Sequence, residues 1–193
     1  CYGQRAKLLN TMNSLEQERF DRQMRFFGRA GQDRIRGARV AVVGIGGLGT
    51  HVVQQTALLG VKAIHLVDAQ ELDKTNLNRY VGATHDDAIP GTLKVDIGER
   101  LARSINRNVE IKKVANSLVS PEAYAAIRVS DCVVGCLDNE GTRLILTELC
   151  AAYAKPYIDL ASDIIPGDRP AYGGRVAIAW DGNGCLSCLG VID

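Results

Sequence analysis

The chain has 193 residues, a length suited to one core that buries roughly 70% of the unfolded surface. Its formal net charge is +1 and its pI is about 7.8, so bulk charge favours neither a nucleic-acid partner nor a membrane surface. No apolar run approaches the roughly 20 residues that span a bilayer, and six cysteines in an α/β pattern are typical of a reducing compartment. We therefore expect a cytoplasmic protein with no membrane and no DNA partner.

The amino-terminal stretch is basic and helical in pattern. Residues 4–30 are predicted to form a helix in which four arginines recur at helical or near-helical spacing: Arg19, Arg22, Arg25 and Arg29. Taken alone, this pattern fits a solvated helix face equally well. Residues 28–37 are predicted to form a turn and a short helix. The chain thus divides into a helical segment over 1–30 and an α/β domain over 31–193. Because neither end carries a start or stop signal, we expect it to be part of a longer protein.

The most informative motif is a glycine-rich turn. Val40–Val43 is a β-branched run that predicts a buried parallel strand, and a helical apolar pattern follows from Val52. Between them lie Gly44, Gly46, Gly47 and Gly49. Glycines let a phosphate approach the backbone, and the N–H groups of the helix start then face the anion. A helix dipole supplies only about 0.3–1 kcal/mol, so cations should come from elsewhere. The alternative is a packing turn without a ligand.

Polar residues follow the next strand, which is predicted over Ala63–Val67. Asp68 closes this strand about 20 residues beyond the glycines, where an acid accepts hydrogen bonds from ribose hydroxyls. A helix cap or a loop acid is the alternative. Asn76 and Arg79 then lie three residues apart, on one face of a short helix or loop. A dehydrogenase has no evident need for that cluster.

Two further charged positions open predicted helices. Lys94 lies in the first turn of an amphipathic helix over Leu93–Asn106, where it opposes the helix dipole unless an anion is near. A surface lysine is the alternative. Asp138 and Asn139 follow the predicted strand Asp131–Cys136, at an edge of the sheet where ligands bind. Asp138 suits Mg²⁺, and capping of the following helix is the competing explanation.

The remaining pattern predicts an α/β fold that is Rossmann-like. Its sheet is mainly parallel, with helices on both faces and an antiparallel extension toward the carboxyl terminus. The other predicted strands are Val109–Val114, Pro156–Leu160 and the antiparallel edge Gly173–Ala179, and the other helices are Pro121–Ile127 and Thr142–Tyr153.

A Cys-x-x-Cys pair follows a glycine-rich turn near the end of the chain. Cys185 and Cys188 have the spacing of half a tetrahedral zinc site, although the other half is not visible in the sequence. A redox dithiol is the rival, but such a pair usually opens a helix after a strand. The remaining cysteines are expected to act as small hydrophobic residues.

In their order, these pieces resemble the ThiF/MoeB family, the adenylyltransferases that include ubiquitin-activating enzymes. The matching segments are Phe20-Asp-Arg-Gln23, Gly44-Ile-Gly-Gly-Leu-Gly49, Asp68, Asn76-Leu-Asn-Arg79, Lys94, Cys136-Leu-Asp-Asn139 with Arg143, and the Cys185/Cys188 pair. Each segment is weak alone, but the ordered set is specific and covers most of the chain. The domain over 31–193 is therefore identified as a ThiF-type adenylation domain.

The resemblance implies ATP-dependent adenylation of the carboxyl terminus of a ubiquitin-like or sulfur-carrier protein with a Gly-Gly tail. By the same resemblance the glycines and Asn139 bind ATP, Asp68 holds the ribose, Asn76, Arg79 and Lys94 line the triphosphate, and Asp138 carries Mg²⁺. Arg22 resembles an arginine that reaches the partner's site in a homodimer. Zinc at Cys185 and Cys188 is a further expectation.

The chain departs from the family pattern at three points. Gln70 stands where a second acid is common, Tyr80 stands where a glutamine is common, and a second cysteine pair is missing. Three other functions remain open. They are activation of a small-molecule or tRNA-attached carboxylate, an NAD-dependent oxidoreductase, and a non-catalytic half of a heterodimeric activator.

Overall fold

The computed structural model describes residues 12–165, 167, 169–180 and 184–192. In these residues the helices are α1 (Ser14–Gly37), α2 (Gly47–Leu59), α3 (Lys94–Ile105), α4 (Pro121–Val129) and α5 (Glu140–Ala152), with short 3-10 helices η1 (Lys74–Asn76) and η2 (His85–Asp87). The strands are β1 (Arg39–Val43), β2 (Ala63–Val67), β3 (Glu110–Val114), β4 (Cys132–Gly135), β5 (Tyr157–Ile165) and β6 (Ala171–Ala179). None of the described helices is long and apolar enough to cross a bilayer.

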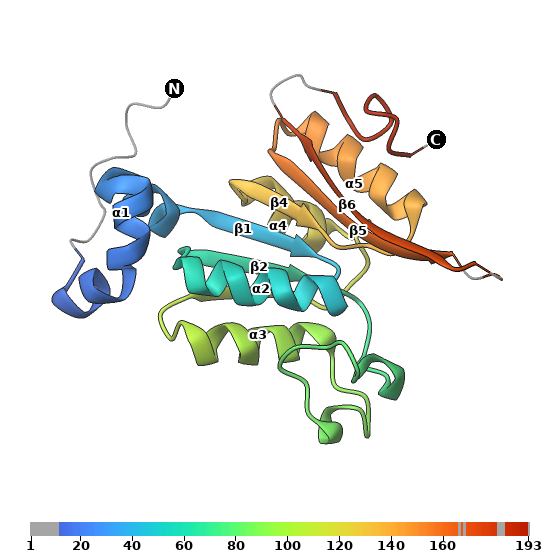
Figure 1. The fold of residues 1–193 in the computed structure, drawn as a ribbon, viewed down its shortest axis with the longest axis horizontal. Coiled ribbons are helices and arrows are strands. Elements are labelled where there is room, and N and C mark those ends of the chain that lie inside the picture. The colour runs from blue at the N-terminus through green and yellow to red at the C-terminus, as the bar shows by residue number, and fades with distance from the viewer. Residues whose placement is uncertain (1–11, 166, 168, 181–183, 193) are drawn as a thin grey trace.

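One mixed sheet organises the described residues. Its strand order is β3-β2-β1-β4-β5-β6, with parallel pairing from β3 through β5 and an antiparallel β5–β6 pair. Successive strands step outward from β1 on one side and from β4 on the other (Figure 1). The chain therefore changes direction between β1 and β4, which is where ligands bind in open α/β sheets. The predicted Rossmann-like fold with an antiparallel carboxyl-terminal extension is confirmed.

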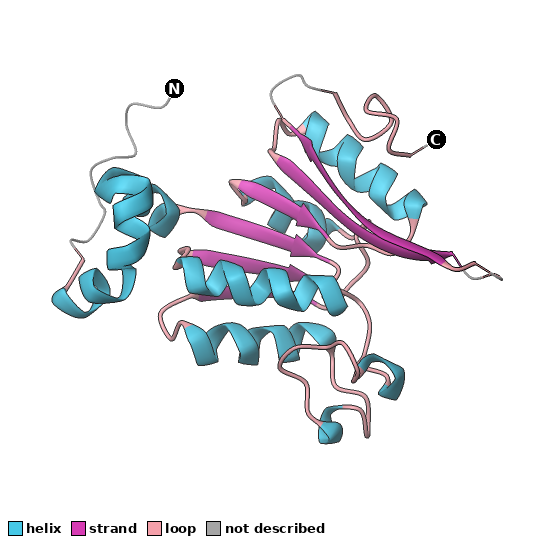
Figure 2. Cartoon of the chain, in the orientation of Figure 1, coloured by secondary structure: helices cyan, strands magenta, loops and turns pink. Residues whose placement is uncertain are grey.

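Helices cover both faces of the sheet and enclose two separate cores (Figures 1 and 2). On one face α2 and α3 pack over a cluster that includes Val42, Ile64 and Ile97. On the other face α4 and α5 pack over a cluster that includes Val43 and Leu146. Adjacent residues of a strand point to opposite faces, so Val42 and Val43 serve different cores. All five residues of β2 are buried, as expected for a parallel strand that is covered on both sides.

The structure corrects the predicted bounds of the last hairpin. The predicted strand Pro156–Leu160 was too short, because β5 continues to Ile165 and β6 starts at Ala171. Polar residues after Leu160 interrupt the apolar pattern, but the antiparallel ladder continues through them to the Ile165–Ala171 pair. Backbone pairing therefore extends this hairpin beyond the apolar part of the strand.

The amino-terminal helix is broken where the sequence predicted a turn. Within α1 the φ angle of Gly28 is +69°, outside the helical range. Asn13 caps the start of α1 by accepting the Glu16 N–H at 2.9 Å. The part of the predicted helix over residues 4–11 lies outside the described residues, and Met12 and Asn13 precede the helix.

A buried carboxylate pins the loop that leads into α3. Asp87 accepts two hydrogen bonds from Arg100, at 2.9 and 2.6 Å, and one from the Thr84 N–H at 2.7 Å. The Arg100 guanidinium also donates to the Gly82 carbonyl at 3.0 Å. The hydrogen bonds from Arg100 lower the pKa of Asp87 from 3.8 to about 2. This clamp fixes the segment immediately before Lys94.

The Asp87 clamp predicts a pH-dependent stability. Because the pKa of Asp87 is lower in the folded than in the unfolded chain, its contribution is complete above about pH 4 and is lost as the pH falls toward 2. We expect Asp87→Asn to lower the free energy of unfolding by about 1–3 kcal/mol at pH 7 and to flatten its decrease between pH 4 and 2. Urea unfolding across this range measures both effects. Asp86→Asn, at an exposed neighbour, is the control, and an unchanged pH dependence in Asp87→Asn contradicts the assignment.

Candidate functional site

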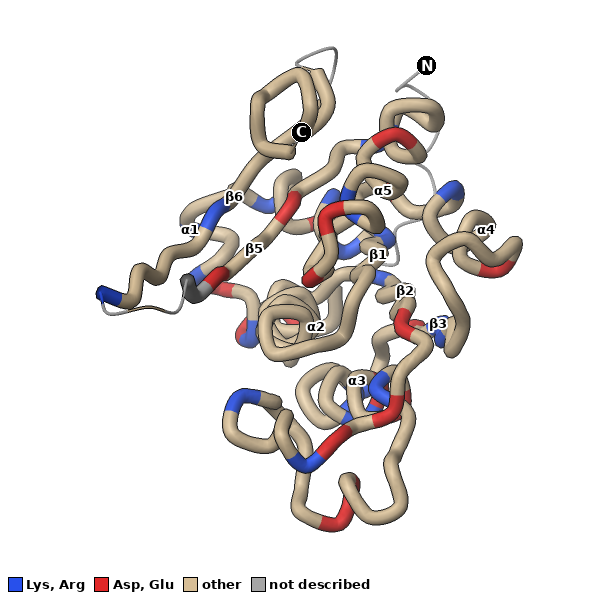
Figure 3. Tube along the Cα trace, turned by 90° about the vertical axis from the view of Figure 1, so that its right-hand side faces the viewer, with Lys and Arg blue, Asp and Glu red and all other residues tan. Residues whose placement is uncertain are grey.

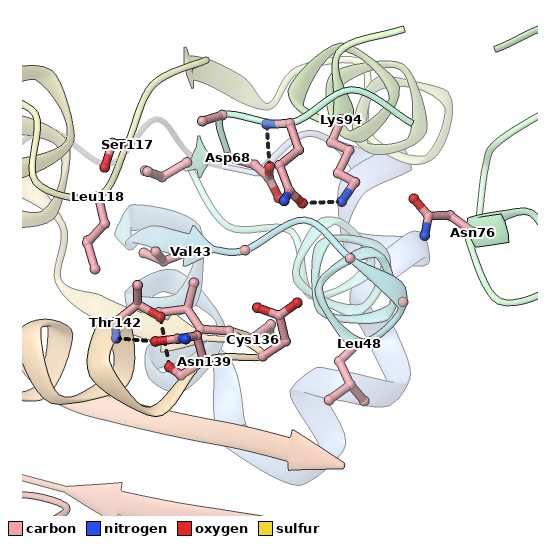
Figure 4. A pocket seen from close by; sticks show the side chains of 18 of the residues that line it. Val43, Leu48, Asp68, Asn76, Lys94, Ser117, Leu118, Cys136, Asn139 and Thr142 are labelled. Atoms are coloured by element: carbon pink, nitrogen blue, oxygen red, sulfur yellow. Dashed lines mark hydrogen bonds between the residues drawn. The ribbon is translucent and has the colours of Figure 1, made fainter. Parts of the chain in front are cut away.

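A cavity of about 970 Å³ lies at the carboxyl ends of the central strands. Its walls come from the segments that follow β1, β2, β3 and β4 and from the start of α3. Of the residues predicted for the site, those on the cavity wall are Gly44, Gly46, Gly47, Asp68, Asn76, Arg79, Lys94, Asp138 and Asn139. Figure 4 shows Asp68 and Lys94 on one side of the glycine turn, and Cys136 and Asn139 on the other. Segments far apart in the sequence therefore meet at the point where the strand order reverses.

The glycine turn brings bare backbone to the cavity. Gly44 has a φ angle of +87°, and a Cβ there would lie 2.7 Å from the Cys136 carbonyl oxygen. At Gly46 an added Cβ would meet nothing within 4 Å, so this position faces open space. Gly49 does not line the cavity, and a Cβ there would overlap the Gly44 carbonyl. Gly49 therefore allows close packing of α2 on β1, whereas Gly46 leaves room for an anion at the helix start.

Asp68 holds the glycine turn in place. One carboxylate oxygen accepts the Ile45 N–H at 2.7 Å, and the other accepts the Gln70 N–H at 2.8 Å. A carboxylate offers about four lone-pair positions, so each oxygen can still accept a hydroxyl. This geometry is compatible with the predicted ribose contact and adds a structural role that the sequence did not indicate.

Three cationic side chains line the cavity. Lys94 is buried, and its ammonium donates to the Gln70 side-chain oxygen at 2.6 Å. Arg79 is exposed, and its guanidinium donates to the Thr75 carbonyl at 2.8 Å and to the Asn78 amide oxygen at 3.0 Å. The third cation, Arg143, entered the sequence prediction only as a motif match. Its distance of four residues from Asn139 on a helix was the available signal that both face the same site.

The sequence left two roles open for Asp138, capping of the following helix and binding of a cation, and the structure gives the first of these to Asn139. The Asn139 side chain caps α5 by accepting the Thr142 N–H at 3.1 Å. In the described part of the chain, no hydrogen bond or ion pair engages the exposed Asp138 carboxylate at the cavity wall. Asp138 is therefore available to a hard cation such as Mg²⁺, which prefers carboxylate oxygens.

Arg22 does not reach the cavity of its own chain. It is exposed on α1 and is not among the lining residues. In Figure 1, α1 lies at the start of β1, whereas the cavity lies beyond the strand ends. Any contact between Arg22 and such a cavity therefore requires a second copy of the chain.

A buried acid lies between two arginines next to the cavity. Asp159 is fully buried, accepts the Tyr157 hydroxyl at 2.9 Å and lies 3.8 Å from both the Arg143 and Arg175 guanidinium groups. Arg143 donates to the Leu137 carbonyl, and Arg175 donates to the Val191 carbonyl at 2.9 Å. Burial, with the nearby Asp159 charge, raises the pKa of Tyr157 and keeps its hydroxyl protonated. Asp159 therefore connects the loop before Asp138 to the last described segment.

The Asp159 cluster predicts a large effect on stability. We expect Asp159→Asn to lower the free energy of unfolding by about 2–4 kcal/mol, because two guanidinium groups lose their shared counter-charge. Tyr157→Phe removes only one hydrogen bond and should cost about 1 kcal/mol. Urea unfolding of both variants at neutral pH gives the comparison. If Asp159→Asn is no less stable than Tyr157→Phe, the charge of Asp159 is not what holds this cluster together.

The cysteine pair has a geometry suited to a metal. The two sulfur atoms of Cys185 and Cys188 lie 3.6 Å apart, and tetrahedral zinc with Zn–S bonds of about 2.3 Å needs roughly 3.8 Å. Hydrogen bonds from the Cys188 backbone and side chain lower the pKa of the Cys185 thiol, which favours the thiolate that binds metal. Across the described residues, no group of three or more His, Cys, Asp or Glu side chains is gathered into a metal site. Residues 181–183 of the preceding turn lie outside the description.

Comparison with known proteins identifies the family of this chain. The model of the ThiF family matches residues 20–192. The chain belongs to the ThiF family. This match includes the glycine turn and the segments that carry Asp68, Arg79, Lys94 and Asp138. The family that the ordered motifs indicated is thereby confirmed.

Individual ThiF relatives cover most of this chain but are longer. The chain is 31% identical over 183 residues to the adenylyltransferase and sulfurtransferase MOCS3 of Anopheles gambiae, which covers 94% of the chain and 40% of that protein. It is 32% identical to the SAMP-activating enzyme E1 of Haloferax volcanii, over 82% of the chain and 63% of that protein. The chain thus spans less than two thirds of these relatives.

Solved structures share the ThiF fold with this chain. E. coli MccB with ATP has a TM-score of 0.70 at 24% identity, over 88% of this chain and 51% of that chain. E. coli tRNA N6-threonylcarbamoyladenosine dehydratase, TcdA, in complex with ATP has a TM-score of 0.69 at 25% identity, over 78% of this chain and 61% of that chain. The MccB match supports the fold alone.

Proposed function

We propose that this chain is an adenylation domain that uses ATP to activate the carboxyl terminus of a small ubiquitin-like or sulfur-carrier protein, releasing pyrophosphate. One observation carries the proposal: Arg79, Lys94 and Asp138, from three separate segments, line one glycine-turn cavity. Relatives named adenylyltransferase and SAMP-activating enzyme support it, as does the ATP in the TcdA structure.

The proposed chemistry depends on positioning and charge neutralisation. The backbone at Gly46 and Gly47 receives the phosphates, Asp68 holds the ribose hydroxyls, and Arg79 and Lys94 bind the outer phosphates. Asn76 and Asn139 add polar contacts at the cavity wall. A carrier carboxylate oxygen bonds to the α-phosphorus while the bond from the α-phosphorus to the bridging oxygen breaks, and pyrophosphate leaves. Mg²⁺ held by Asp138 would neutralise the charge that builds on the phosphate oxygens. No protein nucleophile is required.

A neighbouring cavity offers a route for the carrier tail. It has a volume of about 610 Å³, lies along the β5–β6 hairpin and shares Asp138 and Arg143 with the nucleotide cavity. Gly173 and Gly174 form part of its wall, so an extended peptide can lie close to the backbone of β6. A narrow Gly-Gly tail suits such a passage and would bring a carboxylate toward the α-phosphate.

Pyrophosphate exchange tests the proposed adenylation. The protein is mixed with ATP, Mg²⁺ and candidate carriers that end in Gly-Gly, and labelled pyrophosphate entering ATP is counted. We expect exchange with at least one carrier, and we expect Arg79→Ala and Asp138→Ala each to reduce it by roughly 100-fold or more, because transition-state charge is left uncompensated.

Matched controls separate catalysis from folding in the exchange experiment. Lys74→Ala and Glu148→Ala remove exposed charges from η1 and α5 outside both cavities and should leave exchange intact. Arg79→Ala and Asp138→Ala should melt near the wild-type temperature, since both side chains are exposed. A much lower melting temperature would assign them a structural role. A protein that binds ATP but exchanges with none of the carriers rejects the proposed activity.

Other substrates follow from the same fold but have less support. Activation of a tRNA-attached carboxylate is suggested by the likeness to TcdA. Figure 3 shows acidic and basic residues mixed along the described chain, which fits its net charge of +1, so bulk charge gives little support to an RNA partner. An NAD-dependent oxidoreductase leaves Arg79, Lys94 and Asp138 without a role. Thermal protection by ATP–Mg²⁺ compared with NAD distinguishes the two nucleotides.

We also propose that the chain works as a homodimer in which Arg22 of one copy enters the cavity of the other. The exposed position of Arg22 on α1, away from its own cavity, supports this arrangement. Arg22→Ala and Asp138→Ala should each be inactive alone. Mixed dimers contain one site with both residues, so equal mixing should restore about a quarter of wild-type exchange.

The mixing experiment has a clear opposite outcome. If Arg22 acts within its own chain, each subunit of a mixed dimer still lacks one of the two residues, and exchange stays at the level of the separate variants. Subunit exchange is verified beforehand by mixing tagged and untagged wild-type protein. Failure to recover activity after verified exchange rejects the shared site but leaves the adenylation proposal standing.

Zinc and cellular location complete the proposal. We propose that Cys185 and Cys188 hold one half of a zinc site, since their sulfur separation and the lowered Cys185 pKa suit thiolate ligands. We also propose a cytoplasmic location, because six cysteines in an α/β chain are typical of a reducing compartment.

A further inference from the structure

The ammonium of Lys94 is held by a neutral side chain rather than by an acid. We propose that Gln70 is a positioning residue that fixes Lys94 through an uncharged acceptor and leaves its full positive charge for the triphosphate. This inference rests on the nucleotide site proposed above and extends it to a residue at which the chain departs from the family pattern.

Two hydrogen bonds join Gln70 and Lys94. The Lys94 backbone N–H donates to the Gln70 carbonyl at 2.9 Å, and the Lys94 ammonium donates to the Gln70 side-chain oxygen at 2.6 Å. Gln70 is itself fixed, because its N–H donates to Asp68. A continuous set of hydrogen bonds therefore runs from the glycine turn through Asp68 and Gln70 to Lys94. A side chain that is only 8% exposed and doubly anchored has little freedom to turn away.

Charge balance in the cavity explains why a neutral holder matters. Four acids line the cavity, Asp68, Glu71, Asp73 and Asp138, against the three bases Arg79, Lys94 and Arg143. Among the described residues, no ion pair forms with Lys94, so none of these acids offsets its charge directly.

A carboxylate at position 70 would pair with the Lys94 ammonium and add a fifth acid to the cavity wall. An ammonium has three N–H donors, and the single bond to Gln70 leaves two for phosphate oxygens. Gln70 thus fixes the position of the Lys94 ammonium without lowering the positive potential around it. Gln70 therefore acts at the phosphate end of the site, although it is only two residues from the predicted ribose acid.

Nucleotide binding by charge variants tests the proposal. Gln70→Glu keeps the size and reach of the side chain and changes its charge. Isothermal titration with ATP–Mg²⁺ should show about tenfold weaker binding, as expected when a charge-assisted contact is offset. Binding of adenosine, which has no phosphate, should be unchanged. Gln55→Glu, on an exposed position of α2, adds the same charge outside the cavity and should bind both ligands as the wild type does.

A double-mutant cycle identifies the lysine as the group through which Gln70 acts. In a Lys94→Met background, Gln70→Glu should lose most of its tenfold effect, because the paired ammonium is absent. Gln70→Met, which removes the acceptor without adding charge, should weaken ATP binding about threefold and spare adenosine. This second variant keeps the test open if Gln70→Glu fails to fold.

The possible outcomes separate this proposal from the proposed reaction. Wild-type affinity for ATP in Gln70→Glu overturns the inference, as does an equal loss for ATP and adenosine, or an undiminished effect in the Lys94→Met background. Pyrophosphate exchange by the wild type is measured independently. Absence of exchange in a protein that binds ATP rejects adenylation without touching Gln70, whereas active exchange with an insensitive Gln70→Glu variant rejects only the role of Gln70.

Discussion

The two hydrogen bonds to the Asp68 carboxylate are the constraint on which the rest of the cavity depends. One oxygen fixes the glycine turn through the Ile45 N–H, and the other fixes the loop after β2 through the Gln70 N–H. Because β1 and β2 are parallel neighbours, both segments leave the same edge of the sheet and one short side chain can reach both. By bonding to both segments, the Asp68 carboxylate fixes the position of the glycine-turn backbone at this edge of the sheet.

Much of this arrangement could be predicted from sequence because it follows from topology. Parallel strands place their carboxyl ends at one edge, so residues that directly follow strands, such as Asp68 and Asp138, had to lie near one another. Gly44 and Gly46 were recognisable for the same reason, since the strand before them and the helix after them were both clear. Lys94 was singled out because its position at a helix start is unfavourable unless an anion lies nearby, although a surface lysine remained the alternative.

The missed features depend on contacts between side chains that sequence spacing does not define. Gln70 and Lys94 are 24 residues apart and meet only because a loop folds back to place their backbones in hydrogen-bonding distance. Asp159 lies close to Arg143 and Arg175 across three elements, and polar residues after Leu160 led the predicted β5 to end too early. The division of labour between Asp138 and Asn139 depends on local backbone angles, which decide which side chain can turn back to cap α5.

For the binding of a triphosphate, the positions of the charged groups in the cavity matter more than their net charge. Its four acids outnumber its three bases, which disfavours a triphosphate unless some of the acids are engaged elsewhere or bind a cation. Asp68 is occupied by backbone N–H groups, and Asp138 is left open to a cation, so neither opposes the phosphates in the way that a free acid would. In the function proposed above, such a site would bind the bare nucleotide weakly and the Mg²⁺-bound nucleotide more tightly. In the same proposal, the cavity would also accept a further cation from a second subunit. The exposed Arg22 of that subunit is the candidate. In the function proposed above, dependence on a metal and on a partner subunit would both follow from this local shortage of positive charge.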